Sequence, residues 1–140
     1  MIARAGWGVL AALGIATLLI AHALEPSPAG LGTHEALGLP PCGSRALFSL
    51  PCPGCGLTTA FSHLMRFELS AAVRANPAGV YLFVVNLILI ALGALGALRG
   101  YCFKTVAASR ITRLFAILTL VALFGGWMAR LLWLSSGAVA

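Results

Sequence analysis

The sequence contains no aspartate, and only 9% of its 140 residues are charged. It holds no Ser-His-Asp combination, no H-E-x-x-H motif and no glycine-rich phosphate loop. No complete catalytic set of these kinds can be assembled from the residues present. We therefore favour a role other than catalysis by these sets. Assembly, metal binding and thiol chemistry are the functions that the remaining residues suggest.

The chain also has too few charged side chains to cover the surface of a soluble domain. Hydrophobic residues make up 61% of it, against about half in a typical globular protein. The formal net charge is +6, but the basic residues lie at the ends of apolar runs and form no patch with interleaved aromatic residues. We expect a lipid bilayer as the partner of this chain and no nucleic acid.

Three apolar runs are long enough to cross a bilayer, which takes about 20 helical residues. They cover residues 6–24, 78–98 and 114–134. The predicted fold class is an all-α membrane protein in which the whole chain forms one domain with three transmembrane helices. A secretory signal peptide is the alternative interpretation of residues 1–23, because Ala21-His22-Ala23 resembles a cleavage site.

The distribution of basic residues predicts the orientation of these helices. Arg99, Lys104, Arg110 and Arg113 form a concentrated basic loop between the second and third runs. Short loops rich in lysine and arginine remain in the cytoplasm. We therefore expect a protein of the bacterial inner or plasma membrane with a cytoplasmic N-terminus. Residues 25–56, rich in proline and glycine, then form an extracytoplasmic loop.

An amphipathic helix is predicted over residues 57–75, between this loop and the second apolar run. Its apolar residues recur three and four positions apart, and polar residues occupy the opposite face. Such a helix lies in the membrane interface or packs on the bundle instead of crossing the bilayer. Asn76-Pro77 ends it, because the residue before a proline avoids the helical conformation.

Three cysteines near the start of this helix form the strongest candidate site. Cys52 and Cys55 are separated by a Pro-Gly turn, and Cys42 lies ten residues upstream of Cys52. A helix N-terminus favours thiolates, which suits redox chemistry, although the βαβ framework of thioredoxin is missing. A tight turn that directs two sulfurs at one ion suits a zinc knuckle. A disulfide among the three cysteines is the remaining interpretation.

A structural zinc ion takes four ligands, and the cysteines supply three. His34 or a water molecule is the expected fourth ligand. His63 is the less favourable choice, because it would lie about two helical turns beyond Cys55, roughly 12 Å along the axis. Cys102 falls in the basic loop and is expected to lie apart from the other cysteines.

Two of the polar residues within the apolar runs are candidates for contacts between helices. Arg130 lies about one turn from the outer end of the third run, where it either extends to the interface or pairs with Glu25 or Glu68. Asn86 lies inside the second run, and we expect it to hydrogen-bond between helices.

A family resemblance is carried by three features: Cys42, the run Cys52-Pro53-Gly54-Cys55-Gly56-Leu57-Thr58, and Asn76-Pro77. These features resemble small bacterial membrane proteins of the domain of unknown function 2752 family. The resemblance covers roughly residues 42–86 and implies a membrane fold in which the three cysteines are important; it implies no known activity. Family members carry an arginine after the threonine and a Gly-Asp pair further on, where this chain has Thr59 and Phe67-Glu68.

These observations lead to two functional hypotheses. The first is an accessory or scaffold subunit that docks a larger membrane protein or a second copy of itself, because Gly93 and Gly96 would allow close contact between helices. The second is an extracytoplasmic zinc site or thiol–disulfide redox site formed by Cys42, Cys52 and Cys55.

Overall fold

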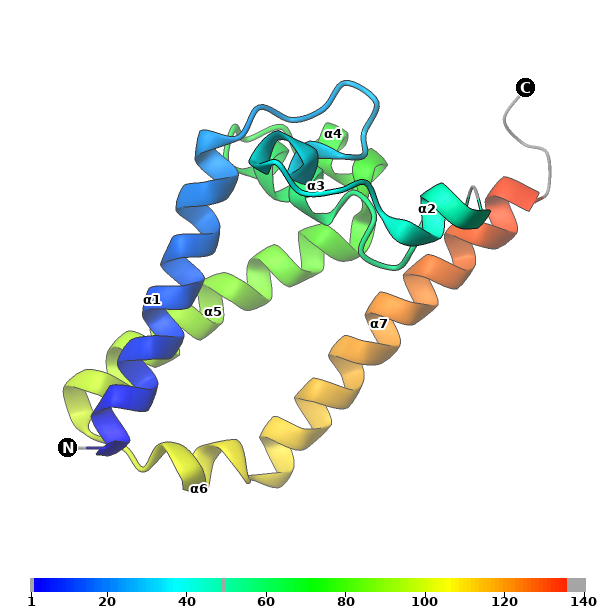
Figure 1. Ribbon diagram of the computed structural model, residues 1–140. Helices are drawn as coiled ribbons and strands as arrows, with labels where there is room; N and C mark the ends of the chain where they lie inside the picture. Colours follow the sequence, from blue (N-terminus) through cyan, green and yellow to red (C-terminus); the bar gives the residue numbers. More distant parts are fainter. Residues whose placement is uncertain (1, 49, 136–140) are drawn as a thin grey trace.

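The computed structural model describes residues 2–48 and 50–135 (Figure 1). This part of the chain is helical and contains no strand. Its long helices are α1 (Ile2–Ala23), α5 (Pro77–Arg99) and α7 (Arg110–Ser135). Its short helices are η1 (Thr33–Leu37), α2 (Gly43–Phe48), α3 (Leu57–Leu64), α4 (Leu69–Ala75) and α6 (Phe103–Ala107). The three long helices are long and apolar enough to cross a membrane, which confirms the predicted fold class.

The short helices gather at the two ends of the long ones (Figure 1). We call the end that holds η1, α2, α3 and α4 the cysteine end, and the end that holds α6 and the start of α1 the basic end. The basic residues of the basic end are Arg4, Arg99, Lys104, Arg110 and Arg113. All three glutamates of the chain, Glu25, Glu35 and Glu68, belong to the cysteine end. Positive charge at the basic end therefore has no acidic residue to balance it.

Small residues allow α1 to pack closely along α5. A Cβ added at Gly93 would come within 2.9 Å of the Trp7 carbonyl oxygen, and one added at Gly96 would overlap the Trp7 indole. The side chain of Asn86 donates a hydrogen bond to the carbonyl oxygen of Gly14, at 3.2 Å. The expected hydrogen bond between helices is thus present, and the α1–α5 pair forms the best-packed part of the long helices.

Gly96→Val is expected to destabilise the α1–α5 pair by about 1–3 kcal/mol, because the new side chain overlaps Trp7. Gly125→Val in α7 is the matched control, since nothing lies within 4 Å of a Cβ added there. Both substitutions change helix propensity equally, so the difference isolates packing. Thermal unfolding in mild detergent measures it, and equal losses for the two variants would contradict the close packing.

The segment over which the sequence predicted one amphipathic helix, residues 57–75, is divided into α3 and α4. The N–H of Phe67 donates to the carbonyl oxygen of Leu64, and the N–H of Glu68 donates to that of His63, each at 3.0 Å. This pair of bonds ends a helix in a Schellman motif, whose residue outside the helix has a left-handed conformation. Phe67 takes that place with φ 61° and is 96% exposed.

Phe67→Gly is expected to stabilise the protein by about 0.5–1 kcal/mol. The left-handed conformation costs a residue with a Cβ about 1–2 kcal/mol, and the greater backbone entropy of glycine in the unfolded chain offsets about 0.5–1 kcal/mol of the gain. Phe67→Ala is the control, because it removes the ring and keeps the strained Cβ. Thermal unfolding of both variants tests the prediction, and a glycine variant no more stable than the alanine variant would refute it.

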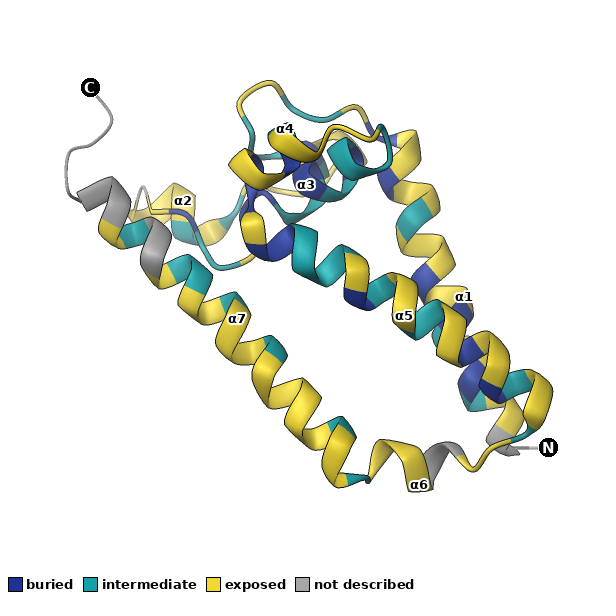
Figure 2. Cartoon of the chain, turned by 180° about the vertical axis from the view of Figure 1, so that it is seen from behind, coloured by how far each residue is buried: buried dark blue, intermediate teal, exposed yellow. Residues whose placement is uncertain are grey.

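The third long helix, α7, is much less packed than α1 and α5 (Figure 2). No residue of Arg110–Met128 is buried. Tyr81 and Pro51 connect α7 to the elements of the cysteine end: the hydroxyls of Tyr81 and Thr119 are 3.1 Å apart, and Trp127 Nε1 donates to the carbonyl oxygen of Pro51 at 2.7 Å. At the basic end Thr112 Oγ1 donates to the carbonyl oxygen of Val106 in α6, and α7 diverges there from α5 (Figure 1).

Candidate metal centre

The three cysteines of the cysteine end meet at one point. The sulfur atoms of Cys42, Cys52 and Cys55 all lie within 4.8 Å of one another, and those of Cys52 and Cys55 are 3.2 Å apart. All three residues are present as thiols. Thiolates bound tetrahedrally to zinc at about 2.3 Å would have their sulfurs about 3.8 Å apart. The sulfurs therefore need to move by only a fraction of an ångström to ligate a common ion.

The Cys52–Cys55 segment is a tight turn stabilised by its own backbone. The N–H of Cys55 donates to the carbonyl oxygen of Cys52 at 3.0 Å, and the N–H of Cys52 donates to the sulfur of Cys55 at 3.2 Å. Gly56 follows with φ 86°, and a Cβ added there would come within 2.6 Å of the carbonyl oxygen of Ala75. Glycine is thus required at position 56 for two reasons: its backbone has a positive φ, and the end of α4 lies too close for a Cβ.

Cys42 reaches the same point from the start of α2. The backbone N–H of Arg45, with smaller contributions from hydrogen bonds to the other two thiols, lowers the pKa of Cys42 to about 7. Burial, together with hydrogen bonding to Cys52, raises the pKa of Cys55 to about 12. The pKa values of these two thiols are thus shifted by backbone hydrogen bonds, by burial and by the neighbouring thiols. A divalent cation would supply the positive charge that lets all the thiols ionise together.

In metal-free protein, Cys42 is expected to be the most rapidly alkylated of the three cysteines near pH 7, because the thiolate is the reacting species. Its rate should rise through a pH of about 7 and level off above it, in keeping with its lowered pKa. The buried thiol of Cys55, whose pKa is raised, should react slowly over the same range. Timed iodoacetamide labelling with peptide mass spectrometry measures both rates.

The control for this experiment is the same protein unfolded in denaturant, in which cysteines ionise near their ordinary pKa of about 8.5. Identical pH profiles for Cys42 in the folded and unfolded protein would contradict the assigned environment.

Asn76 connects this turn to the start of α5. Its Nδ2 donates to the carbonyl oxygens of Cys55, at 3.0 Å, and Pro53, at 3.4 Å. Its Oδ1 accepts the N–H of Gly79 at 3.3 Å, which caps the N-terminus of α5, and Pro77 follows in the first helical position. The sequence predicts only that Asn76 ends the preceding helix. The signal for the second role was an asparagine followed by proline directly before a long apolar run.

Two further hydrogen bonds fix the loop that leads to the cysteines. The hydroxyls of Thr33 and Thr59 are 2.8 Å apart and buried, and Thr33 Oγ1 also accepts the N–H of Ser27 at 2.9 Å. Thr59 is fully buried, and its hydroxyl joins η1 to α3. At the other side of the site, the bond from Trp127 to Pro51 attaches α7 directly beside Cys52.

The histidines and the remaining candidate residues lie elsewhere. Within the described part of the chain, the cluster of close ligand atoms consists of the three cysteines, and His34 is not part of it. Thr33 fixes η1 on α3, and His34 instead lines a hollow with residues of α1 and α3. His63 Nδ1 lies 2.6 Å from Glu68 Oε2. Glu68 thus pairs with His63; the side chain of Arg130, its expected partner, is outside the described part.

The comparison with protein families gives a match over part of the chain. Residues 42–90 match the family model described as Protein of unknown function (DUF2752). We call this matched stretch, residues 42–90, the DUF2752 segment. The segment begins at Cys42 and includes Cys52, Cys55, Asn76 and the first half of α5, so the resemblance predicted from the cysteine motif is confirmed. The comparisons with curated proteins and with solved structures found no match.

Proposed function

We propose that the DUF2752 segment forms a zinc-binding site at the extracytoplasmic face of a bacterial membrane. The observation that carries the proposal is the convergence of three cysteine sulfurs within 4.8 Å of one another. Thiolates are preferred ligands of zinc and of other soft metal ions. The tight Cys52–Cys55 turn and the start of α2 present these sulfurs on backbone that hydrogen bonds already hold in place.

The charge distribution supports the proposed orientation. Arg4, Arg99, Lys104, Arg110 and Arg113 belong to the basic end. Segments rich in basic residues remain in the cytoplasm, and α1, α5 and α7 each connect the basic end with the cysteine end (Figure 1). The cysteine end then lies on the opposite side of the membrane from the cytoplasm.

The proposed ion would join two segments, the start of α2 and the turn that precedes α3. Cys42 precedes α2, whereas Cys52 and Cys55 precede α3, so a shared ion would close the loop between them. Because the described chain brings three ligand atoms together, the fourth zinc ligand is water or a group from another molecule. The ion would thus stiffen this face of the protein and offer one coordination position to a partner.

Metal analysis combined with thiol labelling tests this function. Protein extracted in mild detergent without chelator or reductant is expected to contain about one zinc per chain, with its thiols protected from alkylation until a chelator is added. Thiols that react only after reduction, in protein without metal, would refute the zinc site in favour of a disulfide redox site. Free alkylation of all three without either treatment would refute both.

A second candidate function, an accessory or scaffold subunit, is favoured by the packing of α7. No residue of Arg110–Met128 is buried, and α7 contacts the other elements chiefly through hydrogen bonds to Tyr81, Pro51 and Val106. A helix with so little contact inside its own chain is suited to pack against another membrane protein or a second copy. Cross-linking in native membranes should then yield a larger assembly, and a lone monomer with no associated protein would contradict this role.

A further inference from the structure

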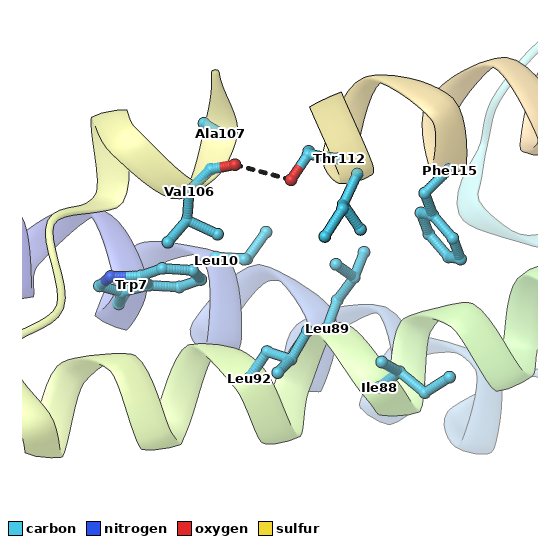
Figure 3. A pocket seen from close by; sticks show the side chains of 10 residues that line it. Trp7, Leu10, Ile88, Leu89, Leu92, Val106, Ala107, Thr112 and Phe115 are labelled. Atoms are coloured by element: carbon cyan, nitrogen blue, oxygen red, sulfur yellow. Dashed lines mark hydrogen bonds between the residues drawn. The ribbon is translucent and has the colours of Figure 1, made fainter. Parts of the chain in front are cut away.

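A hollow of about 410 Å³ lies at the basic end, where α7 diverges from α5. Trp7 and Leu10 of α1, Leu89 and Leu92 of α5, and residues of α6 and the first turns of α7 line it (Figure 3). Its volume falls within the range of about 300–1,000 Å³ that is usual for small-molecule sites. Because it lies between candidate membrane-spanning helices, lipid molecules have direct access to it.

The polar atoms of this lining are already engaged inside the protein. Trp7 Nε1 donates to the carbonyl oxygen of Tyr101 at 2.9 Å. Thr112 Oγ1 donates to the carbonyl oxygen of Val106 at 2.7 Å, a bond visible in Figure 3, and lies 3.0 Å from Ser109 Oγ. The lining therefore offers a ligand apolar contact and no hydrogen-bonding group that is not already occupied, which suits a hydrocarbon chain.

The surroundings of the hollow are strongly basic. Arg110 and Arg113 flank two lining residues, Ile111 and Thr112. Arg4 lies one helical turn before Trp7, and its guanidinium lies beside the end of α5, within 3.0 Å of a Cβ added at Gly100. The glutamates of the chain all lie at the cysteine end. A negatively charged group is thus the complement of this rim.

We propose that the hollow binds an acyl chain of an anionic phospholipid, whose phosphate lies among Arg110, Arg113 and Arg4. Basic pockets between membrane-spanning helices attract anionic lipid headgroups in this way. The N-terminus of α7 adds to the attraction, because its partial positive charge lies at the same rim; Ser109 Oγ caps it by accepting the N–H of Thr112 at 3.1 Å. The apolar hollow and the basic rim together select an amphiphile of negative charge.

Lipid retention by the full-length chain tests the proposal. Protein reconstituted in equal amounts of phosphatidylglycerol and phosphatidylcholine, extracted in mild detergent and examined by native mass spectrometry, should retain phosphatidylglycerol selectively. Arg110→Gln with Arg113→Gln should lower that selectivity about 25-fold, at about fivefold per charge. Ala107→Phe, at an exposed lining residue, should displace the lipid by filling the hollow.

The matched control is Arg45→Gln with Arg74→Gln, which removes the same charge from the cysteine end and should leave retention unchanged. Equal retention of both lipids by the unaltered protein would overturn the proposal, as would selectivity that all these variants keep. Inorganic phosphate at millimolar concentration should not displace the lipid; displacement would show that the rim binds phosphate without the acyl chain and would also overturn it. Absence of zinc from the unaltered protein would refute the proposed zinc site and leave the lipid-retention results unchanged, because the two sites lie at opposite ends.

Discussion

Replacing Cys52 with serine should abolish stoichiometric zinc binding, because it removes one of three converging thiolates and leaves a hydroxyl that is a poor zinc ligand. Loss of an outer-shell partner alone lowers metal affinity about 10–100-fold, and loss of a direct ligand should cost more. Cys102→Ser is the matched control. Cys102 is exposed and belongs to the basic end, so its removal should leave the zinc content unchanged. Elemental analysis and competition with a chromophoric chelator measure the difference.

The same variants should separate metal binding from stability. A ligand that binds only the folded protein stabilises it in proportion to the logarithm of its concentration. A chelator should therefore lower the thermal unfolding temperature of the unaltered protein and of the Cys102→Ser variant. It should have no effect on the Cys52→Ser variant. If chelator affects all three proteins equally, the stabilising ion is bound elsewhere, and the three-cysteine site is refuted.

Asn76→Ala should strongly destabilise the cysteine end while it spares every cysteine. Loss of a helix N-cap costs about 1 kcal/mol, and carbonyl groups left without their donor cost about 1–3 kcal/mol more. The expected total is roughly 2–4 kcal/mol, measured by unfolding in detergent. Zinc affinity should also fall, because Asn76 holds the carbonyl oxygens of Pro53 and Cys55 and thereby the position of the turn.

Two further variants show which of the bonds of Asn76 matters. Asn76→Asp keeps the oxygen that caps α5 and loses the donor to the turn, so it should recover the capping part of the stability and little of the zinc affinity. Asn86→Leu removes an asparagine whose hydrogen bond to Gly14 joins α5 to α1, and should cost only about 0.6 kcal/mol. An Asn76→Ala variant no less stable than Asn86→Leu would contradict the role of Asn76.

The three long apolar helices were predictable because their signal is local. About 20 consecutive apolar residues are needed to cross a bilayer in a helix, and no tertiary contact changes that requirement. The predicted run 78–98 corresponds to α5 (Pro77–Arg99), and the run 6–24 to α1 (Ile2–Ala23). The main difference is at α7, which begins at Arg110, four residues before the predicted run, because Ser109 caps it. Charged residues at helix ends reduce the hydropathy without interrupting the helix.

The amphipathic segment shows the opposite case. Its three- and four-residue spacing continues through residues 65–68, so periodicity alone predicts one helix. The structure ends α3 there through two backbone hydrogen bonds, and Phe67 accepts a left-handed conformation. Separate helices allow the buried residues Ala60 of α3 and Ala72 of α4 to pack into one cluster. The packing of α3, α4 and the start of α5 overrides a local preference.

The sequence by itself determined that this is a helical chain with three apolar segments, a basic end and a cysteine pair held by a tight turn. Each of these properties depends only on residues that are close together in the sequence. Only the tertiary structure decided which other groups join that pair. It brought Cys42 to the pair, placed Asn76 against the turn, paired His63 with Glu68 and left His34 beside α1. These choices depend on how α2, α3 and the start of α5 meet, and sequence spacing contains no information on distances between separate elements.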